Sequence, residues 1–137
     1  MEAARRIVIL VEDSDTSAET LELALRGLPG IELIRHRNAE DAMAHIEGDS
    51  EARCCAMVTD LSLPRMDGFE LIKRAREQRP ADLFPILVIS GDIRPETPAR
   101  ALRLGANAYF HKPYSLLEVR RTLEMLLDDD FQPDNTH

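Results

Sequence analysis

The sequence predicts a single α/β domain in which one parallel sheet is covered by helices on both faces. Three observations favour this class. Short apolar runs recur along the chain, each is followed by a segment with apolar residues at helical spacing, and Pro or Gly residues separate the segments. Strict strand–helix alternation is typical of parallel sheets with right-handed crossovers. A length of 137 residues, 44% of them hydrophobic, suits one domain with its own core.

Five strands are expected, each rich in apolar residues. Their predicted ranges are 7–11, 31–34, 56–59, 85–89 and 108–110. A short apolar run bounded by Pro or Gly is typical of a strand that is buried on both faces. We therefore expect the sheet to lie in the middle of the molecule.

A helix is expected after each strand, and most of these helices have a residue suited to capping. The first helix would be capped by Ser14 or Asp15 and stopped by Pro29 and Gly30. Thr97 would cap a short fourth helix with Pro98 at its first position. The other helices are predicted at 39–47 after Asn38, at 68–79, and through 127 after Ser115. Residues 5–127 would form the domain, and residues 128–137 an acidic, flexible tail.

The composition argues against several classes of protein. A net charge of −8 and a pI near 5.0 argue against direct nucleic-acid binding, which needs clustered Lys and Arg. No apolar stretch approaches the ~20 residues that cross a bilayer, and the N-terminus does not resemble a signal peptide. We expect a cytoplasmic protein with no membrane partner. The adjacent Cys54 and Cys55 are expected to be reduced thiols without a catalytic role.

Polar residues follow four of the predicted strands at the point where each strand ends. Glu12 and Asp13 follow the first strand, Asp60 the third, Ser90 the fourth and Lys112 the fifth. In parallel sheets these ends share one edge, where ligands bind. Asp60 alone would more often be a turn residue, but the other acids at the same edge favour a functional site.

This set of residue types suits a metal ion and a phosphoryl group. Carboxylates gathered at one edge repel each other, and oxygen ligands without His or Cys favour Mg²⁺, for which Mn²⁺ can substitute. Lys112 and Ser90 would contact phosphoryl oxygens, and the backbone at Gly91 could approach closely. Asp60 would then act as the nucleophile and form an acyl phosphate.

Four segments resemble, in order and spacing, the signature blocks of the response-regulator receiver domain. They are ILVEDSD at 9–15, VTDLSLPRMDG at 58–68, VISGD at 88–92 and AYFHKP at 108–113. The resemblance spans residues 5–127 and is to single-domain, chemotaxis-regulator-like members. It implies a flavodoxin-like (βα)₅ sandwich with the strand order 2-1-3-4-5.

The resemblance also implies a role for each matching residue. Asp60 matches the phosphoacceptor, Lys112 the phosphate-contacting lysine, Ser90 the switch hydroxyl and Tyr109 the switch aromatic. The Lys112–Pro113 bond matches the family's cis peptide. Taken alone, Tyr109 would more often be a packing residue at a strand edge with a solvated hydroxyl.

The implied Mg²⁺ ligands are Asp13, Asp60 and the carbonyl of Ser62, with Glu12 acting through water. Ser62 and Asp92 match variable positions that tune the lifetime of the phosphorylated state. The protein would catalyse only its own phosphorylation and dephosphorylation and would not otherwise be an enzyme.

The implied partners are a sensor histidine kinase or a histidine phosphotransfer protein, and a downstream protein at the face made by the fourth helix, fifth strand and fifth helix. Homodimerisation on phosphorylation is a further expectation. Three alternatives stay open: a phosphorylation-independent pseudo-receiver, a receiver excised from a larger regulator or hybrid kinase, and a Mg²⁺-dependent phosphatase of the haloacid dehalogenase type. The phosphatase is disfavoured because Ser62 stands where that class places a general acid.

Overall fold

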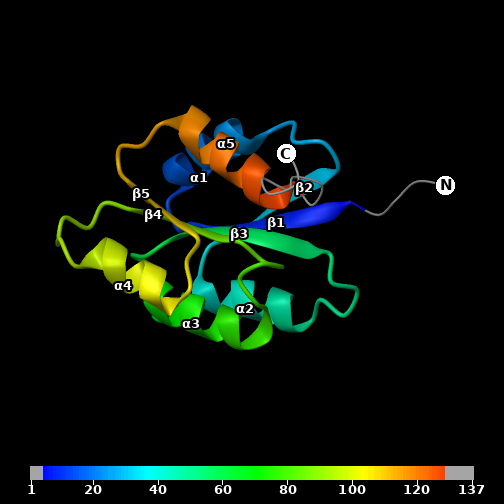
Figure 1. The fold of residues 1–137 in the computed structure, drawn as a ribbon, viewed down its shortest axis with the longest axis horizontal. Helices are drawn as coiled ribbons and strands as arrows, with labels where there is room; N and C mark the ends of the chain where they lie inside the picture. The colour runs from blue at the N-terminus through cyan, green and yellow to red at the C-terminus, as the bar shows by residue number, and fades with distance from the viewer. Residues whose placement is uncertain (1–4, 129–137) are drawn as a thin grey trace, which may run out of the picture.

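The computed structural model describes residues 5–128, which form one five-stranded parallel sheet (Figure 1). The strand order is β2-β1-β3-β4-β5, so the predicted order is confirmed. The strands are β1 (Arg6–Val11), β2 (Ile31–His36), β3 (Cys54–Asp60), β4 (Ile86–Ser90) and β5 (Ala108–His111). All seven residues of β3 are buried, as expected for the central strand of a sheet covered on both faces.

Helices cover both faces of this sheet, with α1 and α5 on one side and α2, α3 and α4 on the other (Figure 1). The helices are α1 (Asp15–Leu25), α2 (Ala39–Glu47), α3 (Gly68–Gln78), α4 (Thr97–Leu104) and α5 (Leu116–Leu127). Leu21 and Leu123 are fully buried on the first side, and Ile46 and Ile72 are almost fully buried on the second. Each face therefore has its own apolar core.

Most of the predicted helix starts are confirmed by capping bonds. Ser14, Asn38 and Ser115 each accept a hydrogen bond from a backbone N–H in the first turn of the helix that follows. Asp67 does the same for α3, where its side chain accepts from Glu70 N–H. These bonds satisfy N–H groups that have no partner within the helix.

Two predicted helix ends were wrong. The first helix stops at Leu25, before Pro29, because Arg26 is extended with a ψ of 141° and Gly27 turns the chain with a left-handed φ of 83°. At α4 the N-cap is Glu96, without a side-chain capping bond, and Thr97 is already helical. Proline is tolerated at every position of the first helical turn, because the N–H groups there have no partner within the helix. The presence of Pro98 therefore does not determine which residue is the N-cap of α4.

Arg76 ties the C-terminal end of α3 to the end of α4. Its guanidinium donates to the carbonyls of Gly105 (2.9 Å) and Phe84 (2.8 Å) and to Oδ1 of Asn107 (2.7 Å). Gly105 has a φ of 121°, and a Cβ there would lie 2.6 Å from Cγ of Arg76. The contact therefore needs glycine at this position both for its backbone conformation and for space.

No helix within residues 5–128 is long and apolar enough to cross a membrane. Cys54 and Cys55 are both buried, and no disulfide joins them. Burial raises the pKa of the Cys54 thiol to about 12, so this group is not a reactive thiolate. The predicted tail at 128–137 lies, except for Asp128, outside the described residues.

Candidate functional site

The strand register brings the predicted site residues to one edge of the sheet. Asp60 pairs with Ile89, so Ser90 lies one residue further along the neighbouring strand. Val11 pairs with Thr59, which places Glu12 beside Asp60 on the other side. A backbone bond from Lys112 N–H to the carbonyl of Ser90 (2.8 Å) adds the end of β5. The edge expected from the sequence is therefore formed by the ends of four adjacent strands, β1, β3, β4 and β5.

Asp60 is the centre of this edge, and the residue is only 4% exposed. Its Oδ1 accepts the backbone N–H of Ser62 at 2.9 Å, and its Oδ2 accepts from Nζ of Lys112 at 2.5 Å. The same Nζ lies 3.6 Å from Oε1 of Glu12. One ammonium group is therefore shared between two buried carboxylates, which keeps their mutual repulsion tolerable.

Glu12 is buried more deeply than its charge would favour. It is 1% exposed, and burial, followed by the repulsion from Asp60, raises its pKa to about 7. Its Oε2 accepts the N–H of Ser14 at 3.2 Å, whereas its buried Oε1 accepts no hydrogen bond. Burial opposes the charged form of Lys112, but the carboxylates of Asp60 and Glu12 hold its pKa above the ordinary value.

The predicted metal ligands differ in their burial. Asp13 and Ser62 are exposed, while Glu12 and Asp60 are buried. Among residues 5–128 no group of three or more His, Cys, Asp and Glu side chains is arranged around a metal position. The donor chemistry nevertheless fits a hard divalent ion, because it consists of carboxylate oxygens and leaves Oε1 of Glu12 without a hydrogen bond.

Ser90 is fully buried, and its Oγ accepts the backbone N–H of Asp92 at 3.0 Å. The Asp92 carboxylate in turn binds Arg94, through the backbone N–H at 2.9 Å and through the guanidinium at 2.5 Å. Hydrogen bonds from Arg94 hold the pKa of Asp92 well below its usual range. Arg94 was missed by the sequence analysis, although its position two residues after an Asp suits a local side-chain-to-backbone turn.

Tyr109 packs with its ring against the core below α2, α3 and α4. Its hydroxyl is buried and has no hydrogen-bond partner within the described part of the chain. The interpretation of Tyr109 as a packing residue with a solvated hydroxyl is therefore wrong on the second point. A buried phenol without a partner costs free energy, which leaves this side chain available for a new hydrogen bond.

Arg35 at the end of β2 was also missed by the sequence analysis. Its Nε donates to the carbonyl of Glu12 at 2.9 Å, and its Nη1 pairs with Asp15 at 2.8 Å. These bonds hold the turn between β1 and α1, on which Glu12 and Asp13 lie. No local signal indicates this contact, because it depends on the pairing of Leu10 with Arg35 in the sheet.

Comparison with known proteins agrees with this geometry. The family model of the response regulator receiver domain matches residues 8–124. The chain belongs to the response regulator receiver domain family. The strand order of the structure is the one that the resemblance to this family implied. The Lys112–Pro113 peptide bond is cis, as the resemblance also implied.

Relatives of this receiver domain are found both as single domains and within longer regulators. An uncharacterized 14.6 kDa protein from the sodA1 3′ region of Leptolyngbya boryana is 32% identical over 88% of this chain and 89% of its own length. The alkaline phosphatase synthesis transcriptional regulatory protein PhoP of Bacillus subtilis is 31% identical over 87% of this chain, but the match covers 48% of that regulator. The crystal structure of a response regulator receiver protein from Pseudomonas putida has a TM-score of 0.76 and 30% identity, covering 90% of this chain and 98% of that one.

Proposed function

We propose that this receiver domain is a phosphoacceptor in two-component signal transduction and that Asp60 accepts the phosphoryl group. The donor would be a phosphohistidine on a sensor histidine kinase or a histidine phosphotransfer protein. The observation that carries the proposal is the buried Asp60 carboxylate, which is bound by Lys112 and flanked by Ser90 and Glu12 at one sheet edge. Membership of the receiver family supports the same role.

The residues present can perform the transfer. A carboxylate oxygen of Asp60 attacks phosphorus, the P–N bond breaks, and its electron pair returns to the imidazole of the donor. Lys112 stabilises the charge on the phosphoryl oxygens. Ser90 Oγ accepts a bond from Asp92 N–H, so its own proton is free to be donated to a phosphoryl oxygen. In the separate dephosphorylation step water attacks phosphorus, the P–O bond to Asp60 breaks, and inorganic phosphate leaves while the Asp60 carboxylate is restored.

A divalent ion, Mg²⁺ or Mn²⁺, would be held by Asp13, Asp60 and the carbonyl of Ser62, with Glu12 acting through water. When bound it would neutralise the charge on the phosphoryl oxygens. Glu12 supports this assignment, since its buried Oε1 lacks a hydrogen bond and its pKa is raised by burial. A cation at this edge would interact with Oε1 and would lower the pKa of Glu12 by favouring its ionised form.

Phosphorylation would be read out through Ser90 and Tyr109. A hydrogen bond from Ser90 to the phosphoryl group would draw the loop before α4 towards Asp60. Tyr109, whose buried hydroxyl has no partner, would respond by changing its packing against α4. The result is a shift between two arrangements of the face formed by α4, β5 and α5, where a downstream protein or a second copy would bind.

Phosphorylation by a small donor tests the proposal directly. Wild-type protein and the Asp60→Asn variant are incubated with acetyl phosphate, with and without Mg²⁺, and their intact masses are measured. We expect a Mg²⁺-dependent, base-labile gain of one phosphoryl group that is absent from Asp60→Asn. Asp82→Asn is the matched control, because Asp82 is exposed near the opposite edge of the sheet.

If wild type gains no phosphoryl group under any of these conditions, the phosphoacceptor role is refuted. The receiver domain would then be a phosphorylation-independent binding module. If Asp60→Asn gains the group to the same extent as wild type, phosphorylation occurs elsewhere and the assignment of Asp60 is wrong.

A further inference from the structure

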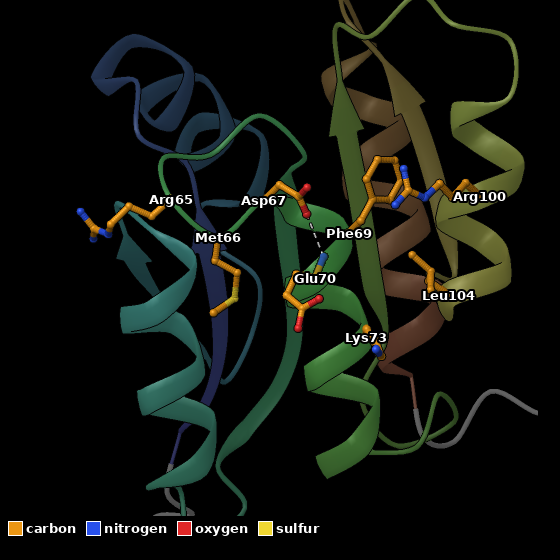
Figure 2. A pocket seen from close by; sticks show the side chains of 8 residues that line it. All are labelled: Arg65, Met66, Asp67, Phe69, Glu70, Lys73, Arg100 and Leu104. Atoms are coloured by element: carbon orange, nitrogen blue, oxygen red, sulfur yellow. Dashed lines mark hydrogen bonds between the residues drawn. The ribbon is translucent and has the colours of Figure 1, made fainter.

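A groove of about 530 Å³ lies over the first turns of α3 and extends to α4 (Figure 2). Its apolar residues come from both sides of α3: Met66 lies towards α2, while Leu104 lies on α4. Phe69, on α3 itself, is buried beneath the groove with only 7% of its surface exposed. The lining residues are Arg65, Met66, Asp67, Phe69, Glu70, Lys73, Arg100 and Leu104. The volume is in the range of pockets that hold a few side chains of a ligand.

The negative charges of this groove are already used within the protein. The carboxylate of Asp67 accepts the backbone N–H of Glu70 at 2.9 Å, as Figure 2 shows. Glu70 itself pairs with Arg74 at 3.0 Å on the next turn of α3. The two acids are thereby committed to capping and to an ion pair within α3, so neither is left to bind a ligand's cation.

In contrast to these acids, two of the basic side chains in the groove form no ion pair within the described part of the chain. Within residues 5–128 neither Lys73 nor Arg100 has a carboxylate at ion-pair distance, although the chain carries a net charge of −8. Arg65, at the far side of the groove, has only a long contact of 3.4 Å to Glu40. A groove that combines the apolar side chains of Met66 and Leu104 with two cations lacking a carboxylate partner among the described residues is complementary to a ligand that is both acidic and apolar.

The side chain of Arg100 is already held in position by its contact with Phe69. Its guanidinium lies over the Phe69 ring, with Cζ 3.9 Å from the ring centroid (Figure 2). Stacking uses the flat face of the guanidinium and leaves the N–H groups along its edge for hydrogen bonding. Those N–H groups match the two oxygens of a carboxylate, and an arginine already fixed by stacking loses less entropy on binding.

We propose that this groove, formed by α3 and α4, binds a short acidic segment of a partner protein. One carboxylate of the segment pairs with Arg100, a second acidic group approaches Lys73, and a neighbouring apolar side chain packs on Met66 and Leu104. At the position beside Arg100 a carboxylate fits better than a phosphate, because Asp67 and Glu70 border the same groove and repel a double charge concentrated at one point more strongly than a single one. The binding requires neither Asp60 nor a phosphoryl group, so it is independent of the proposed phosphoacceptor role.

The test is selection of peptides from a phage-displayed random library on the unphosphorylated wild-type protein. Selected peptides are then synthesised with a fluorophore, and their affinities are measured by fluorescence anisotropy. We expect enrichment of sequences in which Asp or Glu lies within about one helical turn of an aliphatic or aromatic residue. Binding should weaken as salt concentration rises.

Four variants locate the site. Arg100→Glu should weaken binding by about tenfold or more, because it removes a stacked charge pair. Lys73→Glu, at an exposed position, should weaken it several-fold, and Arg100→Lys should give an intermediate loss because the charge is kept without the planar fork. Arg103→Glu is the matched control, since Arg103 is exposed on α4 but does not line the groove. Circular dichroism verifies that each variant is folded.

The proposal is overturned if no sequences are enriched, if the enriched sequences are basic or uncharged, or if their binding is the same for wild type and Lys73→Glu. It is also overturned in favour of a phosphopeptide site if replacing the selected Glu by phosphoserine tightens binding and Arg100→Glu abolishes that gain. None of these results depends on whether Asp60 is phosphorylated, so the two proposals can fail separately.

Discussion

The buried Glu12 should make the receiver domain less stable at neutral pH than at mildly acidic pH. Its folded-state pKa is raised from 4.5 to about 7, chiefly by burial. Between these two values the folded protein binds more protons at Glu12 than the unfolded chain does, so this group's contribution to stability falls as the pH rises. Above about pH 7 the loss is complete. At about 1.36 kcal/mol for each pH unit it amounts to about 3 kcal/mol.

Glu12→Gln removes this titration while nearly keeping the shape of the side chain. Relative to wild type, the variant should be equally stable near pH 5 and more stable by about 2–3 kcal/mol near pH 8. The assay is urea unfolding at a series of pH values, followed by circular dichroism, with a chelator present throughout. Comparing the two proteins at each pH cancels the contributions of all other titrating groups.

Glu19→Gln is the control, because Glu19 is exposed on α1. Its unfolding free energy should follow that of wild type at every pH. If the unfolding free energy of Glu12→Gln also changes with pH in parallel with that of wild type between about pH 5 and pH 8, burial does not control the ionisation of Glu12. The argument that this edge needs a cation would then lose its main electrostatic support.

Two further predictions concern glycine packing and the lifetime of the phosphorylated state. Gly68→Ala should destabilise the protein by about 2 kcal/mol or more, because its Cβ would lie 2.6 Å from the carbonyl oxygen of Asp60. Gly91→Ala is the control and should change the urea midpoint of unfolding little, since its Cβ would meet only one side-chain carbon, at 4.0 Å. Equal midpoints for Gly68→Ala and Gly91→Ala would contradict the prediction that close packing at Gly68 requires glycine. Asp92→Ala, which removes the Asp92–Arg94 pair beside Ser90, should slow loss of the phosphoryl group a few-fold because a polar group that could orient the attacking water is lost. Intact mass measured over time after removal of the donor checks this rate, and equal rates would exclude Asp92 as a rate-tuning residue.

The sequence was sufficient to predict the sheet and the residues at its edge. Asp60 and Ser90 are the last residues of their strands and Lys112 follows β5, and parallel strands bring their carboxyl ends together whatever the details of packing. Their order and spacing also matched a family pattern. The prediction of a shared site therefore depended only on recognising strands, which apolar runs indicate well.

Contacts between distant segments could not be predicted in the same way. The bond from Arg35 to Glu12 and the stacking of Arg100 on Phe69 join residues from different elements. Each depends on the register or crossing of those elements, which single-sequence patterns do not define. The start of α4 was missed for a local reason, since Pro98 is compatible with more than one position in a first helical turn.

The anchoring of α3 to α4 by Arg76 determines which end of the groove can open. The bonds from Arg76 to Gly105 and Asn107 join the two helices where both end, far from Asp60. The opposite end, near the start of α4, is linked to the sheet through the loop after Ser90. A pull on that loop would therefore pivot α4 about its anchored C-terminal end, and the displacement would be largest at the start of the helix, near Thr97, and smaller at Arg100. Movement of that loop would therefore change the width of the groove at the end near the start of α4, while the end held by Arg76 keeps its width.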